Sequence, residues 1–104
     1  MKTVSCEITA EDIADGARFS AYNCPVARAL SRIFGRPCSC GVAVAHAEGL
    51  DSPVSRYEID LSRELSDFIR AYDLGRKASP GVYKVRAPDE LADACSEVPT
   101  SLLQ

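Results

Sequence analysis

Four side chains in this sequence could together hold a metal ion. Cys24, Cys38, Cys40 and His46 offer three thiolates and one imidazole, and zinc accepts these ligand types in tetrahedral sites. Only one residue separates Cys38 from Cys40, and the chain has no CxxC pair, so the spacing is not that of a typical zinc motif. We favour buried structural cysteines, because free cysteine behaves as a small hydrophobic residue, and keep the zinc site as the alternative.

Cys24 could also act through its own thiol. It precedes Pro25 at the start of a predicted helix, and the positive end of a helix dipole lowers the pKa of a thiol placed there. A nucleophilic thiol needs a base, and His46 is the only histidine. Nothing in the sequence brings the two together, so the favoured interpretation is that Cys24 fills space at the helix entry.

The same helix start could bind a small anion. Exposed N–H groups and the dipole attract phosphate, and Arg18, Arg28 and Arg32 could add positive charge. The chain contains no glycine-rich phosphate loop, so solvated arginines are the favoured explanation.

Two aromatic residues lie where no core pattern requires them. Phe19 and Tyr22 fall in the irregular link between the first two predicted helices, close to Arg18 and Arg28. Aromatic residues and arginine are enriched at binding hot spots. We therefore expect Arg18, Phe19, Tyr22, Arg28 and Arg32 to form a contact surface, with the alternative that both rings fold back over the core.

Four carboxylates, Glu58, Asp60, Glu64 and Asp67, lie close together in sequence. They could suggest a magnesium site or an acid–base pair. Their outward alternation, with arginines between them, predicts a solvated charged face instead.

The first half of the chain predicts one strand, two helices and a longer strand. Residues 3–9 alternate in polarity as in a half-buried strand. Thr9 can cap a helix that ends at Gly16, and residues 23–35 have Pro near the first turn and Gly after the last. Residues 38–46 predict a central strand covered by helices on its small-residue side.

The second half predicts strand, helix and strand. After a turn-rich link at 48–53, residues 56–61 alternate and should pair with 38–46 as an antiparallel hairpin. Ser62 begins a helix that Gly75 ends, and residues 81–87 form a last strand. Residues 88–104 remain as an acidic, partly disordered tail with one helical turn around Leu91 to Cys95.

The element order is therefore β-α-α-β-β-α-β. It predicts a single α+β domain over residues 1–87, with a four-stranded, mostly antiparallel sheet and the helices on one face.

Composition excludes several function classes. The 104 residues are 46% hydrophobic and 26% charged with a net charge of -3, which indicates one globular domain and disfavours duplex nucleic acid as a partner. The longest apolar run, 42–45, is too short for a membrane span, and the N-terminal residues lack the apolar stretch of a signal peptide. Five cysteines without an export signal predict reduced thiols in the cytoplasm.

Several phrases of the sequence resemble a family of small, mostly uncharacterised proteins of bacteriophages and prophages. The matching pieces are residues 8–16, 24–30, 57–61 and 67–75, and the resemblance extends over roughly residues 3 to 87. The chain departs from the family pattern at 78–81, where an acidic residue and a second proline are usual, and in its Cys38-Ser39-Cys40 pair. The resemblance implies genomic context, and no active-site residue is carried over from it.

These observations favour a small non-enzymatic binding protein. The resemblance implies a phage accessory or anti-defence protein in the host cytoplasm, which would occlude a host protein or sequester a small anionic ligand without a cofactor. Strand pairing at the sheet edges leaves a homodimer open. The alternative is a zinc- or thiol-dependent module that uses Cys24, Cys38, Cys40 and His46.

Overall fold

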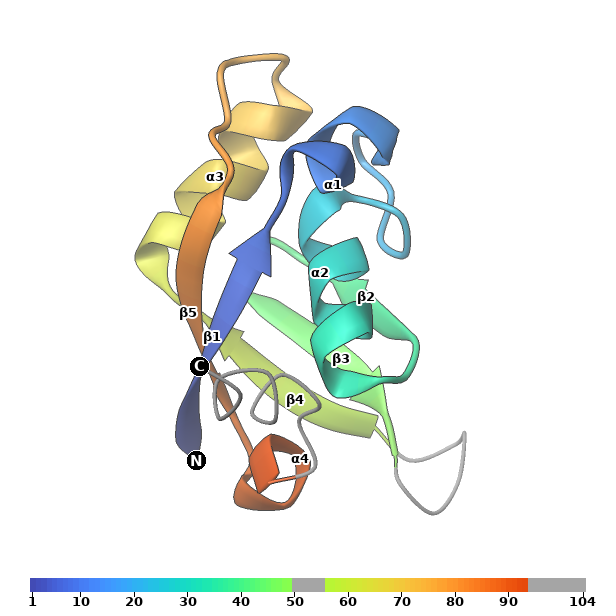
Figure 1. Ribbon diagram of the computed structural model, residues 1–104, viewed down its shortest axis with the longest axis vertical. Coiled ribbons are helices and arrows are strands. Elements are labelled where there is room, and N and C mark those ends of the chain that lie inside the picture. Colours follow the sequence, from blue (N-terminus) through green and yellow to red (C-terminus); the bar gives the residue numbers. More distant parts are fainter. Residues whose placement is uncertain (50–55, 94–104) are drawn as a thin grey trace, which may run out of the picture.

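The protein is built on one antiparallel sheet with strand order β1-β5-β4-β3-β2 (Figure 1). A computed structural model describes residues 1–49 and 56–93. The elements are β1 Lys2–Ile8, α1 Ala10–Asp15, α2 Pro25–Phe34, β2 Cys38–Cys40, β3 Val44–Glu48, β4 Arg56–Leu61, α3 Arg63–Asp73, β5 Gly81–Ala87 and α4 Asp89–Asp93. This architecture confirms the predicted α+β class.

The sheet has five strands, and the prediction of four was wrong at one place. The expected single strand over 38–46 is a hairpin of β2 and β3, which reverses at residues 41–43. The Gly41 N–H donates to the Val44 carbonyl at 2.9 Å, and a Cβ at Gly41 would lie only 3.0 Å from that oxygen. Glycine therefore fits this tight reversal better than a residue with a side chain.

The hairpin also changes which side chains face the helices. Cys38 pairs with Ala47 and Cys40 with Ala45, while Ser39 pairs with His46. Directly opposite residues of a pair share one face of a sheet. The cysteines of β2 and the alanines of β3 therefore lie beneath the helices, and His46 lies on the opposite face, which corrects the predicted alignment of Cys38, Cys40 and His46.

The helices cover one face of the sheet and enclose the core (Figure 1). Leu30 of α2, Leu65 of α3 and Ile59 of β4 are fully buried there, and each such side chain contributes roughly 1.5 to 3 kcal/mol of transfer free energy. Ala45 and Ala47 are also fully buried. Their small side chains leave room for α2 to pack against β3.

The predicted helix ends are present in the structure. Thr9 forms a capping box with Asp12 at the start of α1, and Ser62 caps α3. Cys24 occupies the N-cap of α2, Pro25 follows it, and Gly35 ends the helix in the left-handed conformation at φ 66°. These local signals fix where each helix begins and ends.

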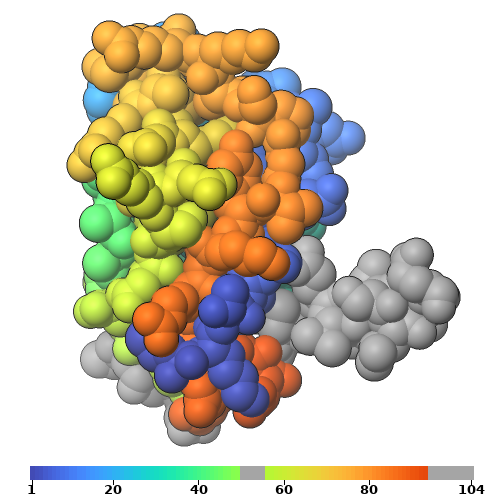
Figure 2. Space-filling view, turned by 90° about the vertical axis from the view of Figure 1, so that its left-hand side faces the viewer, coloured from blue at the N-terminus to red at the C-terminus, as the bar shows by residue number. Residues whose placement is uncertain are grey.

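The uncovered face of the sheet carries charged side chains in complementary pairs. Asp60 lies opposite Arg86, and Glu48 lies opposite Arg56; the Lys84 ammonium donates to the Ser5 hydroxyl at 2.9 Å. Figure 2 shows residues of β4, β5 and β1 side by side below α3, in yellow-green, orange and blue. Such cross-strand pairing is typical of a solvated sheet face.

The core extends beyond Ala87. In α4, Leu91 is fully buried and Ala92 nearly so, and the helix packs against β1. The remainder of the predicted tail, including Cys95, lies outside the described residues, as does part of the link at 48–53.

Candidate functional site

The link between α1 and α2, residues 16–24, is held in place by its own backbone. Ala17 N–H donates to the Asn23 carbonyl at 2.8 Å, and Cys24 N–H donates to the Ser20 carbonyl at 3.2 Å. The edge strand β2 joins it through the Cys40 N–H, which donates to the Ala21 carbonyl at 2.7 Å. The link therefore has a defined shape tied to the sheet.

Phe19 is the most unusual residue of this link. Its φ of 56° is the one positive value among the described residues other than glycine, and such a conformation costs a bulky residue about 1 kcal/mol or more. Its N–H donates to the Asp73 carboxylate of α3 at 3.0 Å, which holds the backbone in place. The residue is 77% exposed, so the strained backbone presents an aromatic side chain to solvent.

Beside Phe19 lies a hollow of about 200 Å³. Its wall includes Phe19, Cys24, Cys40, Val42, Ile69 and Asp73, and we call it the apolar hollow. Val42 in this wall is exposed, and so is Leu74, the residue after Asp73. Exposed apolar residues gathered around a concavity mark interaction sites more often than scattered ones do.

Arg18 lies next to this surface. It is exposed, and a Cβ built at Gly75 would lie 3.2 Å from an Arg18 guanidinium nitrogen. Gly75, at φ 75°, therefore lets the guanidinium rest on the end of α3, and Arg18 supplies positive charge beside Phe19.

Two cysteines meet in the hollow. The Cys24 sulfur accepts a hydrogen bond from the Ala27 N–H at 3.4 Å. A hydrogen bond from the Cys40 thiol and these helix amides lower the pKa of Cys24 to about 7, against the opposing effect of burial. The same contact and burial raise the pKa of Cys40. The Cys40 thiol also donates to the Gly41 carbonyl at 3.1 Å.

The predicted zinc set does not assemble. Cys38 is buried under α2, where its sulfur donates to the Arg36 carbonyl at 3.5 Å, and burial raises its pKa to about 11. His46 lies on the other face of the sheet. Among residues 1–49 and 56–93, no three side chains of the types that bind metals lie close enough to share an ion.

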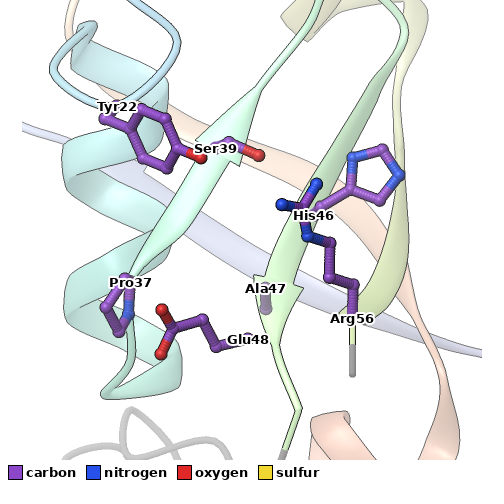
Figure 3. Close-up of a pocket in the computed structure, with 7 residues that line it drawn as sticks. All are labelled: Tyr22, Pro37, Ser39, His46, Ala47, Glu48 and Arg56. Atoms are coloured by element: carbon purple, nitrogen blue, oxygen red, sulfur yellow. The ribbon is translucent and has the colours of Figure 1, made fainter. Parts of the chain in front are cut away.

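Tyr22 faces a different hollow from Phe19. A pocket of about 50 Å³ lies between Tyr22 and the side chains of Ser39, His46, Glu48 and Arg56, which come from the hairpin and β4 (Figure 3). That volume has room for a few water molecules. Phe19 and Tyr22 are both exposed, as the predicted contact surface requires, but they border separate hollows.

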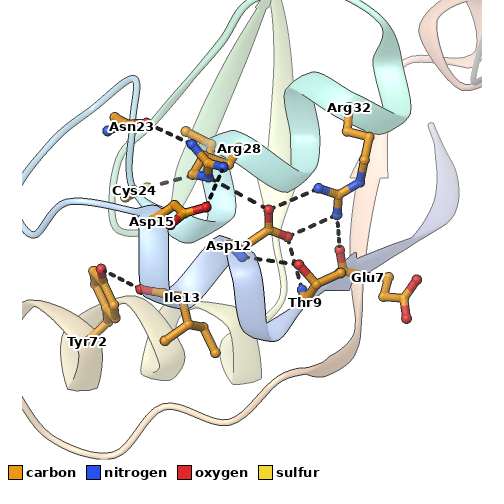
Figure 4. A network of polar contacts seen from close by, with 11 residues as sticks. Glu7, Thr9, Asp12, Ile13, Asp15, Asn23, Cys24, Arg28, Arg32 and Tyr72 are labelled. Atoms are coloured by element: carbon orange, nitrogen blue, oxygen red, sulfur yellow. Dashed lines mark hydrogen bonds and ion pairs between the residues drawn. The ribbon is translucent and has the colours of Figure 1, made fainter.

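Arg28 and Arg32 are engaged by a carboxylate of their own chain (Figure 4). Asp12 is only 2% exposed, and its two carboxylate oxygens accept hydrogen bonds from Arg32 at 2.9 and 3.0 Å. The Arg28 Nε lies 3.8 Å from Asp12, and its Nη2 lies 3.8 Å from Asp15. The predicted contact surface therefore divides, because these two arginines brace α1 against α2 and Arg18 remains beside Phe19.

The Asp12 carboxyl is ionised in this setting. Burial raises its pKa, but the hydrogen bonds from Arg32 and Thr9 outweigh that effect and leave the pKa below its ordinary value. The negative charge that faces Arg28 and Arg32 is therefore the Asp12 carboxylate of the protein itself.

No family model, curated protein or solved structure matches this chain. None of the helices in the described part has the length and apolar character required to cross a bilayer. Functional inference accordingly starts from the geometry of the hollow. Sequence reasoning grouped Cys24 and Cys40 only as part of the expected zinc set, and it missed Asp73 and Val42, which the fold brings to the hollow.

Proposed function

We propose that this chain is a non-enzymatic binding protein that receives an apolar side chain of a protein partner in the apolar hollow. The observation that carries the proposal is Phe19, an aromatic ring exposed to water on a backbone that the fold holds in a strained conformation. Strain and exposed apolar surface both cost folding free energy. A binding role explains why a protein would retain them together.

The size and lining of the hollow favour a protein over a small ligand. Pockets for drug-sized ligands run from roughly 300 to 1,000 Å³, whereas this hollow is about 200 Å³. A volume of that order suits one anchoring side chain, and an apolar centre with Arg18 and Asp73 beside it matches the anatomy of a small protein interface.

A small anion is disfavoured as the ligand. The Asp73 carboxylate lies in the wall, and the positive charges of Arg28 and Arg32 are already paired with Asp12. His46 lies on the opposite face of the sheet from Cys40, which also supports binding in place of acid–base catalysis.

The resemblance to phage and prophage proteins makes a bacterial host protein the first class of partner to test, with occlusion of that protein as the mode of action. The experiment is capture from bacterial extract with the immobilised chain, followed by purification of the captured protein and calorimetric titration. Phe19→Gly removes the ring and suits the positive φ. It should weaken binding by about 30-fold or more if Phe19 is a hot spot.

Val82→Ala is the matched control. Val82 is 61% exposed and lies on the uncovered sheet face, away from the hollow. It should bind as the wild type does. A partner that binds Phe19→Gly and the wild type equally would refute the site, and the absence of any specific partner would count against the function itself.

Dimerisation through the edge strands β1 and β2 is a separate prediction, checked by light scattering.

A further inference from the structure

We propose that Cys24 and Cys40 form a peroxide-reactive dithiol, in which Cys24 is the attacking thiol and Cys40 the resolving one, and that their product is a reversible disulfide across the wall of the hollow. The two cysteines line the hollow proposed for the partner, but their oxidation does not depend on partner binding.

Two elements bring the sulfurs together. Cys24 caps α2, and Cys40 ends the edge strand β2. The Cys40 N–H donates to the Ala21 carbonyl at 2.7 Å, three residues before Cys24, and the two thiols are close enough for their interaction to shift both pKa values. A disulfide requires close approach of the two side chains, and both residues line the same hollow.

Access distinguishes this pair from the other described cysteines. Both residues line the hollow of about 200 Å³, which admits a molecule as small as hydrogen peroxide. Cys40 is partly exposed, and Cys24 is buried where it lines the hollow. Cys6 and Cys38 are also buried, but they do not line it. Among the described cysteines, a dissolved oxidant therefore reaches this pair through the hollow.

The two thiols have different reactivities, which sets the order of attack. The pKa of Cys24 is lowered to about 7 by the Cys40 thiol and the helix amides, although burial and the Asp73 carboxylate oppose this. The pKa of Cys40 is raised by the same hydrogen bond, by burial, and by the nearby Cys24, Cys6 and Asp73. Near neutral pH the thiolate therefore resides on Cys24, and the thiolate is the nucleophile.

The reaction balances with hydrogen peroxide as the oxidant. The Cys24 thiolate attacks one peroxide oxygen; an S–O bond forms, the O–O bond breaks, and the hydroxide that leaves takes up a proton to become water. This gives a sulfenic acid on Cys24. The Cys40 sulfur then attacks the Cys24 sulfur, the S–O bond breaks, and the departing hydroxide leaves as water with the Cys40 proton. Two electrons pass from the sulfurs to peroxide.

The size of the rate advantage follows from the pKa. At pH 7 a thiol of pKa about 7 is roughly 50 times more ionised than one of pKa 9, while its intrinsic nucleophilicity is about eightfold lower, which leaves roughly a sixfold faster attack. We therefore expect Cys24→Ser to slow peroxide consumption on the order of sixfold or more.

The test treats the reduced full-length chain with stoichiometric hydrogen peroxide and maps disulfides in non-reduced peptides. The wild type should form the Cys24–Cys40 disulfide first and lose it on addition of dithiothreitol. Cys40→Ser should instead accumulate a sulfenic acid on Cys24 that dimedone traps. Cys24→Ser is a safe variant because serine is a preferred N-cap residue, and Cys38→Ala is the control that should oxidise as the wild type does.

Circular dichroism and urea midpoints establish that each variant is folded before oxidation. A first disulfide that involves Cys38 or Cys95, or peroxide consumption that is the same in Cys24→Ser and the wild type, would overturn the proposal.

Discussion

We expect Asp12→Asn to destabilise the protein by about 2 to 3 kcal/mol, because the change breaks a buried set of charged hydrogen bonds. The carboxylate accepts two bonds from Arg32 and one from the Thr9 N–H. Removing one partner of a fully buried ion pair costs about 3 to 5 kcal/mol. Here the Arg32 side chain is half exposed, so water recovers part of that loss and the smaller value applies.

The assay is urea denaturation at pH 7 with Asp15→Asn as the control. Asp15 also faces Arg28, at 3.8 Å, but its side chain is 65% exposed, and exposed pairs contribute at most about 1 kcal/mol. In thermal unfolding, the Asp12 variant should melt roughly 10 °C lower. The reasoning is refuted if Asp12→Asn stays within about 0.5 kcal/mol of the wild type, or if the two variants lose the same stability.

The same carboxylate predicts a pH dependence with a definite sign. The folded-state pKa of Asp12 lies below the ordinary value of 3.8, so its contribution to the free energy of unfolding is complete above that value. It is lost as pH falls through the folded-state pKa. The stability gap between the wild type and Asp12→Asn should therefore stay constant from neutral pH down to about pH 5 and narrow below pH 3.8.

Four further predictions concern single sites. Phe19→Gly should unfold within about 1 kcal/mol of the wild type and be more stable than Phe19→Ala, because glycine tolerates the positive φ; urea midpoints of the pair decide this. The iodoacetamide alkylation rate of Cys24 should rise with pH around a midpoint of about 7, and a midpoint near that of free cysteine would contradict the capping argument. Leu91→Ala should cost about 2 to 4 kcal/mol because it empties a core position, whereas the exposed Leu74→Ala should change stability by less than about 0.5 kcal/mol. Gly16→Ala should cost about 1 to 3 kcal/mol, since its Cβ would lie 2.7 Å from a backbone oxygen; an unchanged thermal midpoint would show that the link shifts freely.

The elements with strong local signals could be predicted from the sequence. The last strand was expected at 81–87 and is β5 Gly81–Ala87. Ser62 caps α3 and Gly35 ends α2 as expected, because caps and left-handed termini depend on residues adjacent in the chain.

The hairpin at 41–43 could not be predicted in this way. The run from Cys38 to His46 alternates as one strand would, and the usual dipeptide signals of a tight turn are missing. The reversal depends on the pairing of β3 with β4 and on the packing of α2 over the buried Ala45 and Ala47. Both are tertiary effects.

The candidate site depends on contacts between distant residues. Cys24 meets Cys40 across 16 positions, and Asp73 reaches the Phe19 backbone across 54. The sequence identified Phe19, Arg18 and Cys24 by type. Their arrangement around one hollow required the fold.

The bond from the Cys40 N–H to the Ala21 carbonyl makes the exposed loop and the sheet edge a single cooperative unit. When the loop opens, this amide of the three-residue strand β2 becomes available to solvent deuterium, so its exchange rate reports the opening of the loop directly. Edge segments of this kind belong to the least protected units of a fold. Any molecule that fixes the loop would therefore slow exchange at Cys40, the last residue of β2, and this one amide would register occupancy of the hollow that Cys40 lines.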